Sequence, residues 1–177
     1  ITAAERLGLL DGARLMYSSD HAEAYGNHGI FGKNNLMEPS VRVPLLMSGP
    51  DVPTGHVVRQ FASGVDLFPT LVEGGGARLG AADADIAGRS LFPAMNGHED
   101  AGRIGFAEFH ASASKTGGFM LRDGKDKLLY HVGMRPQLYD LAADPIEAHD
   151  RMELPDARAE ADAQRLETQL RKICDPE

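Results

Sequence analysis

The second half of the chain alternates short apolar segments with turns, and this pattern constrains the fold more than any other feature. The segments cover residues 104–110, 117–123, 126–132 and 136–141, and the sequences DGKD and GMRP separate the last three. Short apolar or aromatic runs joined by such turns are typical of antiparallel strands connected as hairpins. We therefore expect a small antiparallel sheet in this region.

An amphipathic helix should follow that sheet. Apolar side chains between residues 156 and 173 recur at helical spacing and fall on one stripe, namely Ala159, Ala163, Leu166, Leu170 and Ile173. A helix of this kind buries its apolar stripe against another element. We expect it to cover one face of the antiparallel sheet.

The first half of the chain mixes strand and helix patterns. Residues 13–19 and 43–48 are apolar runs that we interpret as strands, the first of them buried. Residues 65–76 have the apolar spacing of a helix, with Pro69 in its first turn and a glycine run from Gly74 that ends it. Residues 77–97 have the composition of a loop.

These patterns predict an α/β fold class in two parts. Residues 1–97 should form an α/β portion, and residues 98–177 a C-terminal α+β subdomain. Asp66 should cap the helix that follows it, because its carboxylate can accept N–H groups of the first turn.

Composition excludes several classes of function. The chain of 177 residues has a formal net charge of −8, which argues against a surface for nucleic acid or anionic membrane, since both need a basic face. No apolar run has the length of a membrane span. The single cysteine, Cys174, permits no intrachain disulfide. It favours a reducing compartment, so the cytoplasm is favoured over the periplasm.

A cluster of chemically active side chains follows the first predicted strand. Within the sequence YSSDHAEAYGNHGIFGK (residues 17–33) lie Asp20, His21, His28 and Lys33. A carboxylate and an imidazole suit a divalent ion, a lysine can hold an anionic oxygen, and a histidine can donate a proton. Gly26, Gly29 and Gly32 would let the backbone turn closely around a ligand. The alternative interpretation is a polar loop with a solvated Lys33 and a His28 that caps a turn.

Glu38 and Arg42 lie four residues apart and could pair. We interpret both as a structural clamp between the loop and the next strand.

The ordered motifs resemble the C-terminal half of the sulfatase family, which belongs to the alkaline-phosphatase-like hydrolases. The matching stretches are YSSDHAEAYGNHGIFGK, MEPSVRVPLLMSGP, VDLFPTL, AGRSLFP, FAEFH, FMLRDGKDKLLYH and QLYDLAADPIEAHD, and they extend over almost the whole chain. The later blocks are most similar to choline-sulfatase-like members. The resemblance implies an alkaline-phosphatase-like mixed sheet sandwiched by helices, followed by the small antiparallel sheet with its C-terminal helix.

The resemblance also implies a sulfuric ester hydrolase and roles for particular residues. Asp20 and His21 match two ligands of a divalent metal, usually Ca²⁺, whose other two ligands come from near the family's N-terminus. Lys33 matches the lysine that contacts the sulfate group, and His28 matches a second catalytic position. His110 could contact the substrate, although a histidine with a structural role in the sheet is the alternative.

The chain also departs from the family pattern. The family's nucleophile is a formylglycine made from the Cys or Ser of a Cys/Ser-x-Pro-x-Arg motif, and no such motif is present, because Cys174 is followed by DPE. The paired N-terminal metal carboxylates are missing as well. Ala22 stands where the family usually has glycine, and its methyl group would crowd a turn that needs positive φ. We therefore expect a C-terminal fragment that does not turn over sulfate esters alone.

Two other functions stay open. A phosphate or phosphonate monoester hydrolase of the same superfamily would share the Asp-His pair. A degenerate, non-catalytic module would bind or assemble without turnover, although the intact Asp20, His21 and Lys33 argue against it.

The start of the chain bears on its assembly. The sequence has no initiator Met and begins with a helical pattern, in which Ile1, Ala4 and Leu7 share a face. If part of the first sheet is missing, strand 13–19 has an unpaired edge and an exposed apolar face, which favours association. We expect a homo-oligomer or poor solubility. The expected partner is a small sulfate-ester substrate, with no nucleic acid and no membrane.

Overall fold

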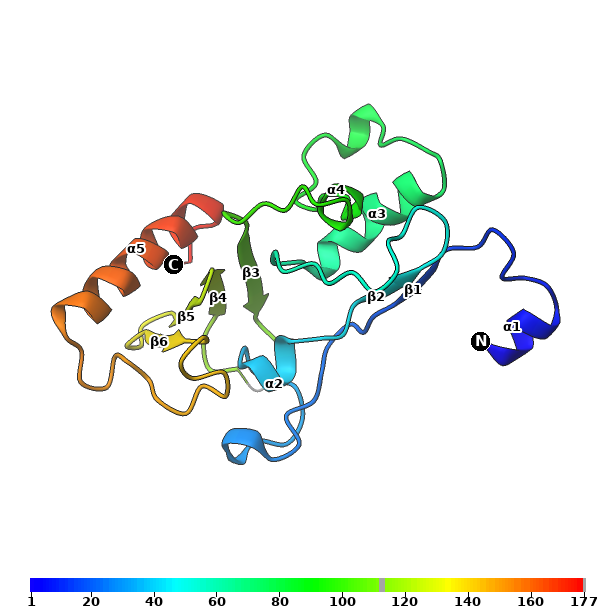
Figure 1. Cartoon of the computed structure of the whole chain (residues 1–177). Helices are drawn as coiled ribbons and strands as arrows, with labels where there is room; N and C mark the ends of the chain where they lie inside the picture. The colour runs from blue at the N-terminus through cyan, green and yellow to red at the C-terminus, as the bar shows by residue number, and fades with distance from the viewer. Residues whose placement is uncertain (112–113, 177) are drawn as a thin grey trace. The chain divides into compact units, whose positions relative to one another are not determined.

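The computed structural model describes residues 1–111 and 114–176, which form two compact units (Figure 1). The first unit contains Ile1–Asp20 and Pro44–Asp100, and the second contains His21–Val43 and the chain from Ala101 onward. One boundary thus lies close to the expected one at residues 97 and 98. The segment 21–43, which we expected in the first part, packs with the C-terminal unit instead.

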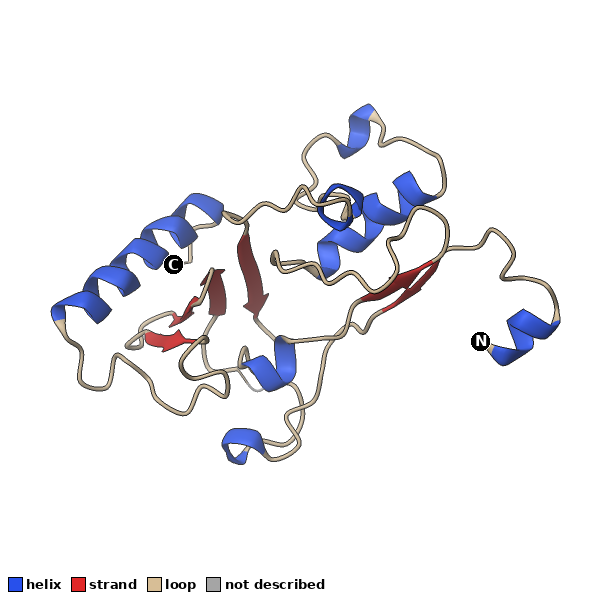
Figure 2. Cartoon of the chain, viewed as in Figure 1, coloured by secondary structure: helices blue, strands red, loops and turns tan. Residues whose placement is uncertain are grey.

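The first unit contains a two-stranded antiparallel sheet (Figure 2). Strand β1 (Leu15–Tyr17) pairs with β2 (Leu46–Ser48), and Met16 lies opposite Met47. Both strands were predicted, but the expectation that 13–19 is a buried strand is wrong. The strand is short and Tyr17 is 63% exposed, because only the alternate side chains of such a sheet can face the core.

The core of the first unit is formed around the short helix α4 (Phe92–Met95), with β2 packed against it. Helix α3 (Leu67–Gly74) confirms the predicted helix, with Pro69 near its start, and follows the 3₁₀ turn η2 (Gly64–Asp66). The region expected to be a loop contains η3 (Ala81–Asp83) and α4 (Phe92–Met95). Helix α1 (Thr2–Arg6) has no buried residue. The apolar cluster is formed by Leu91, Phe92 and Met95, with Met47 and other partly buried side chains against it.

Asp66 is fully buried, and its side chain does not cap α3 as expected. Its carboxylate oxygens accept the backbone N–H of Ser63 at 2.8 Å and of Arg89 at 2.9 Å. Neither donor belongs to the first turn of α3, so the predicted partners were wrong. Asp66 instead joins the start of the helical region to the distant segment around Arg89.

The second unit is built on a four-stranded antiparallel meander, as predicted. Its strands β3 (Ile104–Phe109), β4 (Gly118–Asp123), β5 (Asp126–His131) and β6 (Gln137–Asp140) pair in sequence order. The helix α5 (Ala157–Ile173) begins after Asp156, whose carboxylate accepts the N–H of Ala159. The predicted stripe covers one face of the sheet through the cluster Leu121, Leu128, Leu138, Ala159, Ala163 and Leu166, whereas Ile173 is exposed.

The opposite face of this sheet packs against segment 21–43. Alternate strand residues point this way and form a second cluster with Leu36, namely Met120, Leu129 and Tyr139. The short helix α2 (Glu38–Val41) lies in the same segment, and η1 (Asn27–Gly29) precedes it. The sheet therefore supports the segment that contains His21, His28 and Lys33.

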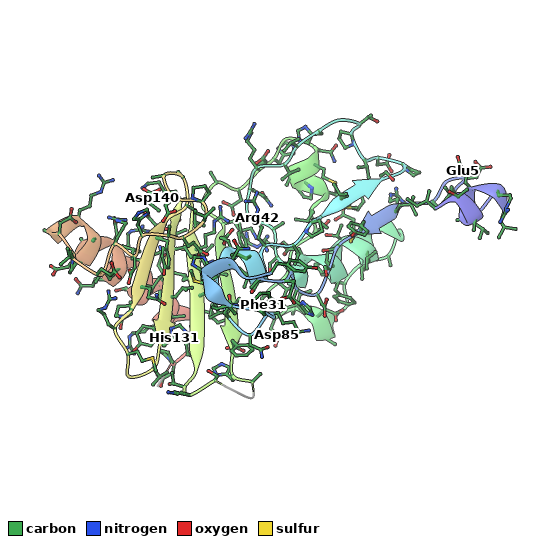
Figure 3. All side chains as sticks on the ribbon, turned by 90° about the horizontal axis from the view of Figure 1, so that it is seen from below. Glu5, Phe31, Arg42, Asp85, His131 and Asp140 are labelled. Atoms are coloured by element: carbon green, nitrogen blue, oxygen red, sulfur yellow. The ribbon has the colours of Figure 1, made fainter. Side chains whose placement is uncertain are left out.

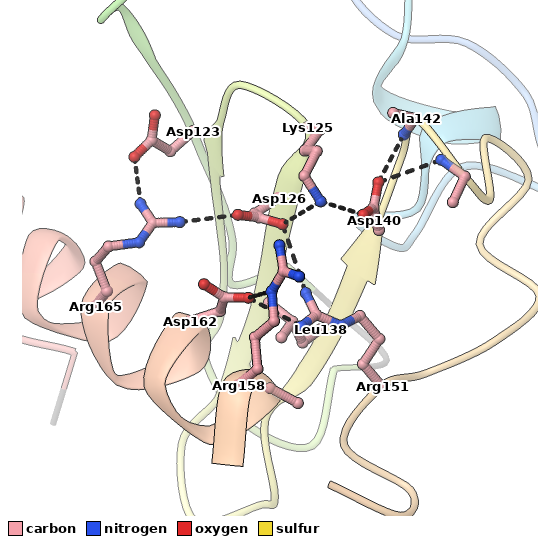
Figure 4. Close-up of polar contacts among 12 residues, drawn as sticks. Asp123, Lys125, Asp126, Leu138, Asp140, Ala142, Arg151, Arg158, Asp162 and Arg165 are labelled. Carbon is pink, nitrogen blue, oxygen red and sulfur yellow. Dashed lines mark hydrogen bonds and ion pairs between the residues drawn. The ribbon is translucent and has the colours of Figure 1, made fainter. Parts of the chain in front are cut away.

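Charged side chains join α5 to the turn between β4 and β5 (Figure 4). Arg165 contacts Asp126 at 2.9 Å. Arg151, in the segment before α5, lies 3.5 Å from Asp126 and 2.9 Å from Asp162 on α5. A hydrogen bond from Lys125 lowers the pKa of Asp140. Asp140 and His131 lie at opposite ends of the sheet (Figure 3).

None of the helices in the described part of the chain has the length and apolar character of a membrane span.

Candidate functional site

The segment after β1 folds into a compact loop by backbone hydrogen bonds. The N–H of Ala24 donates to the carbonyl of Gly32 at 3.0 Å, and the N–H of Gly26 donates to that of Ile30 at 2.9 Å. Gly26, Gly29 and Gly32 all have positive φ, which glycine adopts without strain. The turns that we predicted at these glycines are therefore confirmed, and their closeness to a ligand stays a prediction.

Ala22 does not create the expected strain. It is absent from the residues with positive φ. Its N–H donates to the carbonyl of Ser40 at 2.9 Å, which ties the start of the loop to the end of α2. A methyl group at this position is therefore tolerated by the backbone.

Two of the predicted site residues meet in this loop. The ammonium of Lys33 contacts Nε2 of His21, while Nδ1 of the same ring lies 2.9 Å from the carbonyl oxygen of Ala22. Because a carbonyl only accepts, Nδ1 carries the ring proton and Nε2 keeps its lone pair. The half-buried His21 thus presents Nε2 to the same place as the Lys33 ammonium.

Asp20 is the last residue of the first unit, and His21 is the first residue of the second. The Asp20 side chain is exposed, and its Oδ1 lies 3.4 Å from the hydroxyl of Ser19. A carboxylate and an imidazole fit a divalent metal as part of a ligand shell, but Ca²⁺ takes about six to eight oxygen ligands. Among the described residues no group of three or more His, Cys, Asp or Glu side chains could hold a metal. This chain's donor set therefore fits part of a metal site.

The remaining predicted residues lie in different settings. His28 is exposed and has a left-handed backbone with φ 54°. His110 follows β3, where its Nε2 lies 3.5 Å from Glu108 Oε2 and its ring packs edge-on against Phe119. Cys174 follows α5, and burial raises the pKa of its thiol.

Glu38 does not pair with Arg42, so the expected partner was wrong. Glu38 pairs with residues of the sheet instead. Oε1 of Glu38 lies 3.0 Å from the ammonium of Lys127 on β5, and its Oε2 lies 3.6 Å from Arg122 on β4. The ammonium of Lys127 also lies 2.7 Å from Glu147. Four charges, two of each sign, therefore anchor α2 to the sheet.

Sequence reasoning missed this cluster. The signal that could have found it is the alternation of side chains between the two faces of the strand that contains Lys127. Lys127 shares a face with Leu129, which packs toward Leu36, so its side chain must point into the protein.

Comparison with known proteins gives a consistent result. The family model described as N-sulphoglucosamine sulphohydrolase, C-terminal, matches residues 26–175. Choline-sulfatase from Rhizobium meliloti is 35% identical over 151 residues, which is 85% of this chain and 29% of that protein. Arylsulfatase K from Rattus norvegicus is 34% identical over 158 residues, which is 83% of this chain and 28% of that protein.

Solved structures share the fold. A protein in complex with its substrate D-glucosamine-2-N,6-O-disulfate superposes with a TM-score of 0.84 at 24% identity and covers 99% of this chain and 38% of its own. The phosphonate monoester hydrolase of Agrobacterium radiobacter superposes with a TM-score of 0.81 at 30% identity, over 97% of this chain and 37% of its own. The predicted fold class is confirmed.

The chain spans less than a third of the length of the curated relatives described above. The expected family resemblance is confirmed by the family model and by relatives above 30% identity. The chain therefore belongs to the sulfatase family, and it matches the C-terminal region of that family's members.

Proposed function

We propose that the protein to which this chain belongs hydrolyses sulfate esters, and that this chain contributes part of its active site. The observation that supports the proposal best is the contact between Lys33 and His21 in a chain of the sulfatase family. It puts a cation beside the imidazole that would bind a metal. A sulfate group needs both kinds of positive charge, because negative charge develops on its oxygens and on the leaving oxygen.

In this proposal each residue has a distinct role. Asp20 and His21 are two ligands of a divalent metal of the calcium type, and Lys33 holds a sulfate oxygen. When bound, the metal supplies Lewis-acid stabilisation of that negative charge. His28 is the second catalytic residue, His110 contacts the substrate, and a formylglycine nucleophile comes from outside this chain.

A second candidate is hydrolysis of phosphonate or phosphate monoesters. It rests on the 30% identity to the phosphonate monoester hydrolase, which is close to the 35% identity to the choline-sulfatase. Both reactions transfer a group with anionic oxygens, so Lys33 would serve either one. A non-catalytic module is the third candidate, and it predicts no turnover of any ester.

The first experiment is to sequence the coding DNA upstream of Ile1. We expect an open frame that encodes a Cys/Ser-x-Pro-x-Arg motif and an acidic pair. The protein from that frame is then assayed on 4-nitrophenyl sulfate and on a phenylphosphonate ester, before and after chelation of metal. Higher kcat/KM on the sulfate, lost on chelation and restored by Ca²⁺, supports the proposal.

Two variants test the role of the loop. Lys33→Ala should lower kcat/KM at least a hundredfold, whereas Lys172→Ala, an exposed lysine on α5, should leave it unchanged. Equal activity of both variants would exclude Lys33 from the site. The isolated 177-residue chain should show no turnover above its Lys33→Ala variant.

A further inference from the structure

A pocket of about 320 Å³ lies within the second unit, beside the loop that contains Lys33. Its volume is at the lower end of the range of small-molecule sites, about 300–1,000 Å³. Polar and apolar side chains face it from three segments of the unit. The polar ones include Asn35, Lys115 and His131, and the apolar ones include Leu36, Phe109 and Met134.

Asn35 presents an unsatisfied donor in this region. Its Oδ1 accepts the N–H of Met37 at 2.9 Å, which identifies Nδ2 as the amide nitrogen. Nδ2 is buried and has no hydrogen-bond partner among the described residues. Buried amide groups are nearly always hydrogen-bonded in folded proteins, so this one calls for an acceptor other than the described residues.

His131 is a second polar group that lines the pocket. The absence of a side chain at Gly118 gives its ring space. His131 ends β5 opposite Gly118, and a Cβ built on Gly118 would lie 3.2 Å from Nε2 of the His131 ring. Burial lowers the pKa of His131, so its imidazole is neutral near pH 7 and offers one donor and one acceptor. Within residues 1–111 and 114–176 the structure gives this ring no hydrogen-bond partner.

Lys115 adds charge to the pocket. Its side chain is exposed and forms no ion pair with the described residues. Three groups that can donate hydrogen bonds, one of them cationic, therefore face one pocket. The apolar side chains that also line the pocket suit the C–H surface of a ring.

We propose that this pocket binds the alcohol part of the ester, as a hydroxyl-bearing ring of monosaccharide size with an anionic substituent. The anionic substituent is held by Asn35 and Lys115, and ring hydroxyls are held by His131. This assignment rests on the proposed function, in which Lys33 holds the sulfate group. A tight turn joins the pocket to that lysine. In that turn the N–H of Asn35 donates to the carbonyl of Lys33 at 2.8 Å.

The test uses a sugar acid that carries no sulfate, so that binding does not depend on the reaction. Methyl β-D-glucuronide is titrated into the ¹⁵N-labelled protein, with methyl β-D-glucoside as its uncharged counterpart. We expect saturable shifts of the Asn35 side-chain amide and the His131 ring, and at least tenfold weaker binding of the glucoside. Equal binding of both sugars, shifts that map elsewhere, or no saturation would overturn the inference.

Variants separate this inference from the proposed function. Lys115→Gln and Asn35→Ala should each weaken glucuronide binding at least fivefold, whereas Lys172→Gln, at an exposed position on α5, should not change it. Lys115 is exposed, so its variant retains the fold and keeps the test decisive. Glucuronide binding without sulfate-ester turnover would reject the proposed function and keep the pocket. Lys33-dependent turnover without glucuronide binding would reject the pocket alone.

Discussion

The ammonium of Lys127 lies 2.7 Å from a carboxylate oxygen of Glu147, and neither side chain has any exposed surface. The same ammonium lies 3.0 Å from Glu38, whose backbone N–H donates to Glu147 at 2.6 Å. Three segments distant in sequence thus meet at one buried cation. Removing one partner of such a pair leaves an uncompensated buried charge.

Lys127→Met should therefore destabilise the protein strongly. We expect the free energy of unfolding to fall by about 3–5 kcal/mol, measured by urea denaturation. The matched control is Lys125→Met, which removes an exposed pair with Asp140 and should cost about 0–1 kcal/mol. Equal losses for the two variants would show that Lys127 is accessible to solvent in solution.

Arg14 holds the first unit together through its guanidinium fork. It donates to the carbonyls of Pro50 at 2.9 Å and Gly74 at 2.7 Å, and it pairs with Asp51. Arg14→Lys keeps the charge but lacks the planar set of guanidinium N–H donors. We therefore expect the free energy of unfolding to fall by about 1.5–3 kcal/mol, measured by thermal or urea unfolding. Arg6→Lys, in the exposed helix α1, is the control and should be neutral.

Gly88 lies against the backbone of Val65 in the first unit. A Cβ built on it would lie 1.9 Å from the Val65 carbonyl oxygen, so the backbone must shift to admit a methyl group. Gly88→Ala should lower the free energy of unfolding by about 1–3 kcal/mol. At Gly80 the nearest atom is the Asp83 carboxylate oxygen at 3.6 Å, so Gly80→Ala should be tolerated. Comparable melting temperatures for the two variants would contradict the packing at Gly88.

His131 should make stability depend on pH in the mildly acidic range. Burial lowers its pKa below 6.5 in the folded protein, so the unfolded chain takes up the proton first. The free energy of unfolding should therefore fall as pH drops from about 7.5 to about 5.5. The pKa values of Asp140 and Asp144 are lowered from the ordinary value of 3.8, so these carboxylates affect the free energy of unfolding at a more acidic pH than His131 does.

His131→Asn should flatten that slope, because asparagine does not titrate. The comparison is made by urea denaturation at several pH values, with His149→Asn as the exposed control. An unchanged slope in His131→Asn would show that other groups cause the dependence.

Local patterns in the sequence were enough to predict most of the second unit. The meander and the helix α5 follow from apolar residues at strand and helix spacing, because these periods decide which side chains share a face. The ordered motifs likewise indicated the family, and the glycines of the loop indicated its turns.

Only the tertiary structure decided which distant groups meet. Glu38 pairs with Lys127, which is 89 residues away, and not with its neighbour Arg42. Spacing along one element reports on local geometry alone, whereas ion pairs and pockets depend on how separate segments pack. For the same reason the sequence showed Lys33 and His21 as candidates, but the fold brought their side chains into contact.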